Sequence, residues 1–358
     1  MSNMKVLTFG AGALGTYLGG SLALAGEHVV FLEQPALVDQ LRHRGLRLDL
    51  TIDRRRPGSE AKTVSPASVI FADSLQEALR YGPFDAALYA LKSYDTPAAL
   101  EAIRPFAERM PPLVCFSNGV DNEPALAEVL GPAKVVPGTV STAIGRRAAG
   151  DIVLERLRGI GVATAHPLSR SLIAASNAAY LRAHPYANAA AMKWSKLLTN
   201  LIANPTSAIL DMTAAEVFAN PRLYALEIGM LRECLAVMRA QGLPVVDLPG
   251  TPVRALAFAV QLPVWLSKPL LAGAAGAGRG DKMPSLHIDL HSGRGKSEVE
   301  YLHGAVVRAG RRFGVRTPIN ALLTDTLMDL TRGTTPLSKY SHQPAKLLAA
   351  LRPPARLP

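Results

Sequence analysis

The first half of the chain alternates short apolar runs with amphipathic segments. The apolar runs have the length of buried strands, and the segments between them have the 3.6-residue period of helices. The predicted strands are residues 5–9, 28–32, 86–91 and 112–116, and the predicted helices are residues 14–25, 37–44 and 98–109. Strands that alternate with helices are typical of a parallel, doubly wound α/β sheet joined by right-handed crossovers.

The pattern changes near Asn188, where long helical periods replace the strands. Residues 221–241 and 297–313 have the clearest periods, so an all-α domain is expected to follow the α/β domain. An irregular loop is predicted within residues 251–284. The expected organisation is an α/β domain over residues 1–187, a helical domain over residues 188–335 and a loosely ordered, proline-rich tail over residues 336–358.

Length and charge limit the classes of protein to consider. The 358 residues exceed one ordinary hydrophobic core, which favours two domains. The net charge of +11 raises the question of a nucleic-acid partner. However, the arginines fall in separate groups, and no finger, homeodomain or RNA-binding signature accompanies them. A solvated basic surface is therefore favoured, with no nucleic acid as partner.

Two segments imitate membrane or export signals. The N-terminal residues resemble a secretory signal, but the six glycines between Gly10 and Gly26 have the chemistry of turns. Residues 255–267 are apolar but shorter than the roughly 20 residues of a membrane-spanning helix, so no membrane partner is expected. The only cysteines, Cys115 and Cys234, lie in apolar surroundings, which favours core positions and a cytoplasmic location.

A glycine-rich loop follows the first predicted strand. The motif is Gly10-x-Gly12-x-x-Gly15, and it opens a helix. In that context the glycines permit a tight turn, a close approach to a pyrophosphate and close helix packing, so dinucleotide binding is predicted. A purely structural turn is the alternative, since a lone motif of this kind is a weak signal.

The second predicted strand ends at Glu33, about twenty residues after the loop. A carboxylate there accepts hydrogen bonds from ribose hydroxyls and repels a 2′-phosphate, which favours NAD. Arg42, Arg44 and residues 54–56 could still reach such a phosphate, so NADP stays open.

Two polar side chains follow later strands. Lys92 comes after the strand predicted at 86–91, and Asn118 comes after the strand at 112–116. Ligands of open α/β sheets bind outside the carboxyl ends of the strands, so both residues are candidates for cofactor contact. The alternatives are a solvated lysine and an ordinary Asn-Gly turn.

The segment "WSKLLTNLIANP" (residues 194–205) places Lys196, Asn200 and Asn204 four residues apart. On one continuous helix these three side chains would form a narrow polar stripe on an otherwise apolar surface. A helix face turned to solvent is the simpler interpretation, and a catalytic stripe is the functional one. Further on, Ser285, Asp289 and Glu298 precede a helix for which Ser297 and Glu300 predict a capping box.

The order of these features resembles the ketopantoate reductase family over residues 5–327, with W-x-K-L-x-x-N-x-x-x-N-P as the most specific motif. The resemblance implies a Rossmann-type α/β domain with a parallel sheet, followed by an all-α domain, with the active site in the cleft between them. It implies reduction of a 2-oxo acid, such as 2-dehydropantoate to pantoate, with NADP or NAD as cofactor. It leaves a homodimer open.

The resemblance also assigns roles to individual residues. Lys196 is implied to be the catalytic acid, and no metal ion takes part. The implied substrate-binding residues are Asn118, Asn200, Asn204, Ser285 and Glu298. The implied cofactor-binding residues are Gly10, Ala11, Gly12, Ala13, Leu14, Gly15, Glu33, Lys92, Asn118, Ile144 and Glu298. Glu233 matches an acid of the family whose role is not assigned.

Three departures from the family pattern keep alternatives open. Gln34 stands where NADP-dependent members have an arginine, Ala214 stands where pantoate-forming members have an asparagine, and residues 251–284 form a longer segment. One alternative is an NAD-dependent D-2-hydroxy-acid dehydrogenase acting on bulkier 2-oxo acids. Another is a dinucleotide-binding regulator without catalytic activity.

Overall fold

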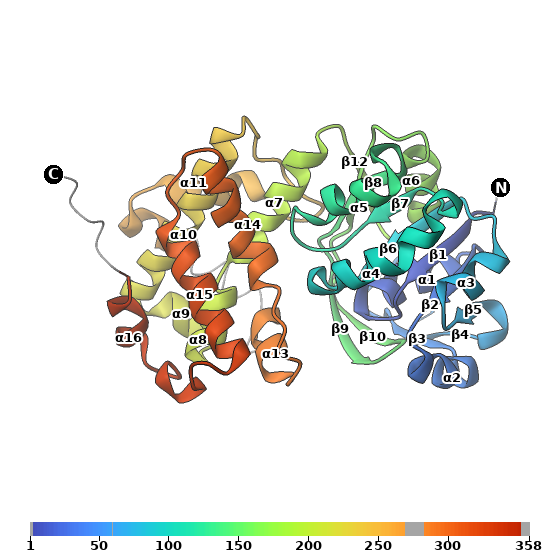
Figure 1. Cartoon of the computed structure of the whole chain (residues 1–358), viewed down its shortest axis with the longest axis horizontal. Coiled ribbons are helices and arrows are strands. Elements are labelled where there is room, and N and C mark those ends of the chain that lie inside the picture. Colours follow the sequence, from blue (N-terminus) through green and yellow to red (C-terminus); the bar gives the residue numbers. More distant parts are fainter. Residues whose placement is uncertain (1–2, 59, 269–282, 352–358) are drawn as a thin grey trace. The chain divides into compact units, whose positions relative to one another are not determined.

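The computed structural model describes residues 3–58, 60–268 and 283–351. The chain divides into two compact units, each described separately below (Figure 1). The first unit comprises Met1–Lys193 with Leu248–Thr251, and the second comprises Trp194–Asp247 with Pro252–Pro358. The irregular loop predicted at 251–284 is wrong for its first part, because Val253–Gln261 form the α-helix α11. Residues 269–282 of that segment lie outside the described residues.

The first unit contains an eight-stranded sheet in the order β12-β11-β8-β7-β6-β1-β2-β5. These strands are β1 (Lys5–Phe9), β2 (His28–Leu32), β5 (Ile70–Ala72), β6 (Ala86–Tyr89), β7 (Leu113–Cys115), β8 (Val135–Val140), β11 (Ile160–Ala163) and β12 (Ala183–Tyr186). Neighbouring strands are parallel, except that β8 and β11 are antiparallel. The predicted parallel α/β domain is confirmed.

A four-stranded sheet with the order β4-β3-β10-β9 belongs to the same unit. Its strands are β3 (Leu46–Asp49), β4 (Lys62–Val64), β9 (Ala143–Ala148) and β10 (Asp151–Arg156). The helices of the unit are α1 (Ala13–Leu24), α2 (Pro35–Arg44), α3 (Leu75–Ala78), α4 (Thr96–Ile103), α5 (Asn122–Leu130) and α6 (Ser169–Ala178). No element was predicted over residues 148–186, where the structure has β10, β11, α6 and β12.

Both faces of the large sheet are covered, because successive residues of a strand point to opposite sides. In β1, Val6 packs in one apolar cluster with Leu18 of α1, and Leu7 packs in a second cluster with Ile103 of α4. Val6 and Leu7 are both fully buried. This two-sided burial explains why the central strands are continuous apolar runs rather than alternating ones.

The helix predicted at 98–109 is divided. The α-helix α4 ends at Ile103, and Arg104–Arg109 form a 3-10 helix. Pro105 lies near the start of the second piece, where it has no N–H to donate and its ring opposes a continuing α-helix.

The second unit is helical, as predicted. Its elements are α7 (Ala189–Leu201), which starts in the first unit, α8 (Asn204–Leu210), α9 (Ala214–Ala219), α10 (Pro221–Ala240), α11 (Val253–Gln261), α13 (Ser285–His291), α14 (Val299–Arg312), α15 (Pro318–Arg332), the 3-10 helix η6 (Leu337–Lys339) and α16 (Pro344–Ala349). None of the helices in the described residues has both the length and the apolar character needed to cross a bilayer.

The continuous helix predicted for residues 194–205 is wrong. α7 ends at Leu201, Ala203 has a left-handed backbone with φ of 51°, and Asn204 begins α8. The buried carboxylate of Glu227 compensates for the break by accepting a hydrogen bond from the Ala203 N–H at 2.7 Å. Asn204 therefore does not continue a stripe on one helix.

Two smaller predictions also differ from the structure. The capping box at Ser297 and Glu300 does not form: Ser297 accepts a bond from Val299 N at 3.3 Å, and Glu300 pairs with Arg332 at 3.4 Å. Residues 336–351 of the tail are ordered rather than loose, since α16 buries Leu347. Proline lies in the first turn of α16, where a missing N–H costs little. Residues 352–358 of the tail lie outside the described residues.

Candidate functional site

The glycine loop has the backbone that its motif requires. Gly10 has φ of +85° and donates to Leu32 O at 2.8 Å, which forms the tight turn after β1. A Cβ at Gly15 would lie 1.9 Å from Gly10 O, so only glycine lets α1 pack this closely. A Cβ at Gly12 would meet no atom within 4 Å, which leaves the loop backbone open to a ligand.

The start of α1 suits a phosphate group. Its N-cap residue is Gly12, which offers no side chain to the first N–H groups of the helix. Uncapped N–H groups at a helix N-terminus attract anions, because the helix dipole adds to their own polarity. Ala11, Ala13 and Leu14, which the resemblance implies as cofactor-binding residues, lie at this same turn.

Glu33 is joined to the glycine loop. Its Oε2 accepts a hydrogen bond from Ala11 N at 2.7 Å, and its Oε1 accepts one from Gln34 N at 2.8 Å. A carboxylate has about four acceptor positions, so it retains capacity for ribose hydroxyls. The carboxylate also places negative charge beside the loop, where it would oppose a 2′-phosphate.

Most of the arginines considered as partners of a 2′-phosphate have other roles. Arg42 donates to Phe71 O at 2.8 Å and to Glu77 at 3.0 Å, and Arg44 donates to Ala149 O. Arg55 and Arg56 both pair with Asp53, at 2.7 and 3.4 Å. Arg56 is buried, so it does not belong to the solvated basic surface that was predicted for the arginines in general. Arg54 is exposed.

Lys92 and Asn118 follow neighbouring parallel strands, β6 and β7. Ser117 Oγ donates to Leu91 O at 2.7 Å, which joins the residues directly before them. Ser93 Oγ and Asn122 Nδ2 both donate to Asn118 O, at 2.7 and 2.6 Å. The two strand ends are therefore held together, and Lys92 and Asn118 lie on adjoining loops at one edge of the sheet.

Ile144 lies in β9, opposite Leu154 of β10. Its side chain is partly buried against the apolar cluster that contains Leu18. The turn of this hairpin contacts the glycine loop, since Gly150 N donates to Ala11 O at 2.9 Å. The hairpin that carries Ile144 is thus fastened to the predicted cofactor loop.

In the second unit, four predicted residues are joined by hydrogen bonds. Lys196 Nζ donates to Asn200 Oδ1 at 2.9 Å, and Asn204 Nδ2 donates to Asn200 O at 2.9 Å. Asn204 Nδ2 also lies 3.4 Å from Ser285 Oγ. The left-handed Ala203 keeps Asn204 within reach of Asn200 although the helix is broken. We refer to Lys196, Asn200, Asn204 and Ser285 as the polar series.

Glu298 and Asp289 are both buried acidic residues. Glu298 is 1% exposed and directly precedes α14, and Asp289 is 8% exposed on α13. Glu233 has a structural position: its carboxylate accepts bonds from Ile319 N at 2.8 Å and Asn320 N at 2.9 Å at the start of α15. Burial raises the pKa of Glu233, although these hydrogen bonds act against that rise.

The sequence did not reveal the buried pair of Lys193 and Glu123, whose charged atoms are 2.7 Å apart. Lys193 Nζ also donates to Ser117 O at 2.7 Å, directly before Asn118. Burial by itself would lower the pKa of Lys193, but the Glu123 carboxylate outweighs it and the pKa is raised. The only feature of the sequence that pointed to this pair was a lysine at an apolar position of α7.

A group of three side chains, Asp211, His287 and His291, was also not predicted, although the H-x-x-x-H spacing of the two histidines was visible in the sequence.

Comparisons with known proteins agree along most of the chain. Residues 6–165 match the family model described as ketopantoate reductase PanE/ApbA, and residues 188–331 match the model of its C-terminal part. A curated 2-dehydropantoate 2-reductase of Archaeoglobus fulgidus is 26% identical over 338 residues, which are 93% of this chain and 98% of that protein.

Solved structures have a similar fold. A PanE/ApbA family ketopantoate reductase from Ralstonia eutropha JMP134 has a TM-score of 0.75 at 26% identity, covering 92% of this chain and 99% of its own. D-mandelate dehydrogenase, solved with NADH and anilino(oxo)acetate, has a TM-score of 0.72 at 18% identity, with coverage of 92% and 99%. At that identity the second likeness concerns the fold alone.

Proposed function

Because this chain belongs to the ketopantoate reductase PanE/ApbA family, we propose that it reduces 2-dehydropantoate or a closely related 2-oxo acid, with Lys196 as the general acid. Membership makes the chain an NAD(P)-dependent oxidoreductase that acts on a carbonyl or secondary alcohol. The substrate and the residue roles are the proposal. The observation that carries it is the polar series, in which an ammonium group and two amides are held together.

A reduced nicotinamide supplies the hydride that is added to the 2-oxo carbon. Negative charge then develops on the substrate oxygen, which the Lys196 ammonium stabilises and to which it gives a proton, leaving a 2-hydroxy acid. General acid catalysis of this kind contributes about 10²- to 10⁴-fold in rate, roughly 3 to 5 kcal/mol. The proton on Nζ is the one that the substrate receives.

The rest of the polar series positions the two partners of this proton transfer. Asn200 Oδ1 accepts from Lys196 Nζ and so restricts where the ammonium points. Asn204 and Ser285 are neutral donors suited to the substrate carboxylate or hydroxyl, and neutral groups avoid repelling the lysine. In the proposal, Asn118, Lys92, Ile144 and Glu298 complete the contacts to cofactor and substrate.

A second candidate is an NAD-dependent D-2-hydroxy-acid dehydrogenase that prefers bulkier 2-oxo acids. The observation that favours it is the Glu33 carboxylate, bonded to Ala11 N beside the loop that suits the pyrophosphate. The hydrogen bonds of Arg42 and Arg44 to other groups act in the same direction, so we propose NAD as the preferred cofactor. Family membership, by contrast, argues against a regulator without catalytic activity.

One panel of assays separates these candidates. NADH and NADPH are each offered with 2-dehydropantoate, with small aliphatic 2-oxo acids and with aromatic 2-oxo acids, and the loss of reduced nicotinamide is followed. The main proposal expects the highest kcat/KM with 2-dehydropantoate or a similar branched acid, whereas the second expects it with an aromatic acid. If neither cofactor is oxidised with any 2-oxo acid, both candidates are wrong.

We also propose a cellular compartment for the enzyme. Cys115 and Cys234 are both unpaired and buried, which agrees with a reducing compartment, and we place the enzyme in the cytoplasm.

A further inference from the structure

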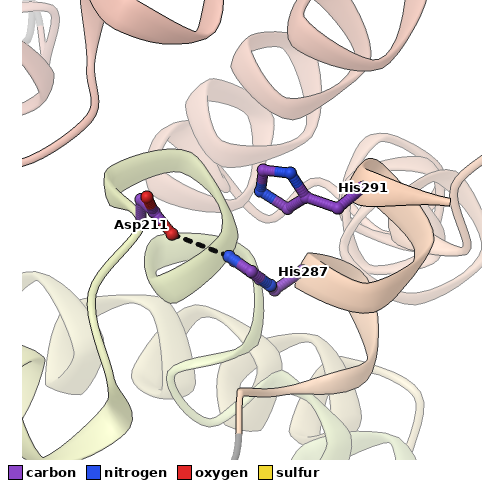
Figure 2. A group of neighbouring side chains, drawn as sticks. All are labelled: Asp211, His287 and His291. Carbon is purple, nitrogen blue, oxygen red and sulfur yellow. Dashed lines mark hydrogen bonds and ion pairs between the residues drawn. The ribbon is translucent and has the colours of Figure 1, made fainter. Parts of the chain in front are cut away.

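Three side chains outside the polar series converge within the second unit (Figure 2). They belong to Asp211, His287 and His291, and the ligand atoms that they offer all lie within 4.8 Å of one another. His287 Nε2 is 2.8 Å from Asp211 Oδ1, and the two imidazole rings have centroids 4.2 Å apart. We refer to these three residues as the histidine cluster.

The local fold places the three groups together. His287 and His291 are four residues apart on α13, a spacing that puts both side chains on the same face of a helix. Asp211 follows α8 directly and has a left-handed backbone with φ of 53°, a conformation that aspartate tolerates better than most residues. Figure 2 shows the carboxylate facing His287, with the ring of His291 beside it.

An ion pair explains only part of this arrangement. Asp211 and His287 form such a pair by themselves, but it gives no reason for a second imidazole next to the first. Two imidazoles and one carboxylate are, however, a recurring donor set for zinc, with the fourth position taken by water. We infer that the histidine cluster binds one divalent transition-metal ion, with Zn²⁺ as the favoured ion.

The distances and exposure suit such an ion. Two ligand atoms on a tetrahedral zinc ion are roughly 3.3 Å apart, so side-chain rotations suffice to bring the cluster into place. Asp211 and His291 are exposed, which gives the ion access from solvent. Imidazole ligands select Zn²⁺ over Mg²⁺ or Ca²⁺, which prefer oxygen ligands. Cys115 and Cys234 are buried, so neither competes as a thiolate.

The ion would fasten α13 to α8. These helices already meet near their first residues, because Leu286 N donates to Asn204 Oδ1 at 3.1 Å and Asn204 Nδ2 lies 3.4 Å from Ser285 Oγ. The cluster joins the end of α8 to the remainder of α13. A bound ion would thus restrict movement of Ser285 relative to Asn204. Any effect of this restriction on a 2-oxo acid rests on the proposed function, whereas binding of the ion does not.

Metal binding is measured on the full-length chain without an affinity tag, after treatment with a chelator and its removal. Zn²⁺ is titrated in competition with a chromophoric indicator, and Co²⁺ is added separately to observe its visible absorption bands. We expect one equivalent of Zn²⁺ per chain and Co²⁺ bands typical of a four-coordinate site. No cofactor or 2-oxo acid is present, so the result is independent of reductase activity.

The variants His291→Ala and Asp211→Asn test the assignment of the ligands. Each removes one ligand, so the affinity for Zn²⁺ is expected to fall at least tenfold and the Co²⁺ bands to be lost. Asp211→Asn retains a side chain that tolerates the left-handed backbone and guards against misfolding. His43→Ala removes an exposed histidine from α2 and should keep wild-type affinity. Wild-type protein without stoichiometric Zn²⁺, or variants with unchanged affinity, would overturn the inference.

Discussion

Lys196 and Lys193 are three residues apart on α7 but differ in burial. Lys193 is fully buried against the Glu123 carboxylate, and that pair fixes its charge and its position. Lys196 is only half-buried, and the amide oxygen of Asn200 accepts from it at 2.9 Å. The amide oxygen orients the ammonium group, and the half-buried position leaves Lys196 more accessible than the buried Lys193. This accessibility favours Lys196 as the residue that acts on a developing oxyanion.

Replacing Lys196 by alanine tests this role. The variant Lys196→Ala lacks the proton donor, so kcat for reduction of the preferred 2-oxo acid should fall at least a hundredfold, about 3 kcal/mol in the barrier. Binding of the reduced cofactor, measured by its fluorescence, should stay close to wild type, because the glycine loop is intact. Lys346→Ala, which removes an exposed lysine on α16, is the matched control. A kcat within threefold of the control would remove Lys196 from the mechanism.

Among the elements, the junction between α7 and α8 matters most for the polar series. The left-handed Ala203 ends one helix and lets Asn204 start the next. Glu227 of α10 holds this junction, because its carboxylate accepts bonds from Ala203 N at 2.7 Å and from Thr206 Oγ at 2.5 Å. The geometry between Lys196 and Asn204 thus depends on a helix distant in sequence.

Glu227→Leu should therefore weaken both the fold and the site. It leaves the buried N–H of Ala203 without its acceptor, at a cost of about 1 to 3 kcal/mol in the free energy of unfolding. We also expect a higher KM for the 2-oxo acid with little change in KM for the cofactor. Urea unfolding and steady-state kinetics measure these two effects. Glu300→Leu, at an exposed ion pair, is the control and should cost less than about 1 kcal/mol. Equal behaviour of the two variants would exclude the role of the junction.

At the scale of the whole molecule, the sequence predicted those elements of the fold that are determined by residues close together in the chain. The strands β1 and β2 were predicted residue for residue, because their burial on both faces makes continuous apolar runs. The glycine loop was predicted for the same reason, because its motif lies within six consecutive residues. The break at Ala203 was not predicted, because "NLIANP" keeps a helical period and the acceptor that permits the break comes from α10.

Contacts between segments that are distant in the chain could not be predicted from the sequence either. Lys193 with Ser117, and Asp211 with His287, are each 76 residues apart. Such pairs depend on the order of strands and helices in space, which a local period does not encode. The antiparallel pairing of β8 with β11 was missed for the same reason, since a crossover pattern predicts parallel neighbours. The chemistry of Lys196, Asn200, Asn204 and Ser285 was visible as residue types, but their hydrogen bonds were not.

The free energy of unfolding of the whole molecule depends on pH, and a buried histidine accounts for part of that dependence. His303 on α14 is fully buried, and its Nδ1 donates to Asn320 Oδ1 at 2.9 Å. Its Nε2 has no hydrogen-bond partner among the described residues. Burial lowers the pKa of His303 to about 3, because a charged ring would lack compensation there. The unfolded chain, with a pKa near 6.5, therefore takes up this proton first as the pH falls.

Stability from this group should be complete above about pH 6.5 and decline between that value and about pH 3, by about 1.4 kcal/mol per pH unit. Between pH 7 and pH 5 the loss is about 2 kcal/mol. His303→Gln keeps an N–H for Asn320 but cannot take up the proton, so it should lose that much less stability over this range. Urea unfolding followed by tryptophan fluorescence measures it, because Trp194 and Trp265 both lie in the second unit. His43→Gln, at an exposed position, should keep the wild-type dependence. If His303→Gln loses as much stability as the wild type on acidification, the buried neutral ring is not what makes the second unit sensitive to acid.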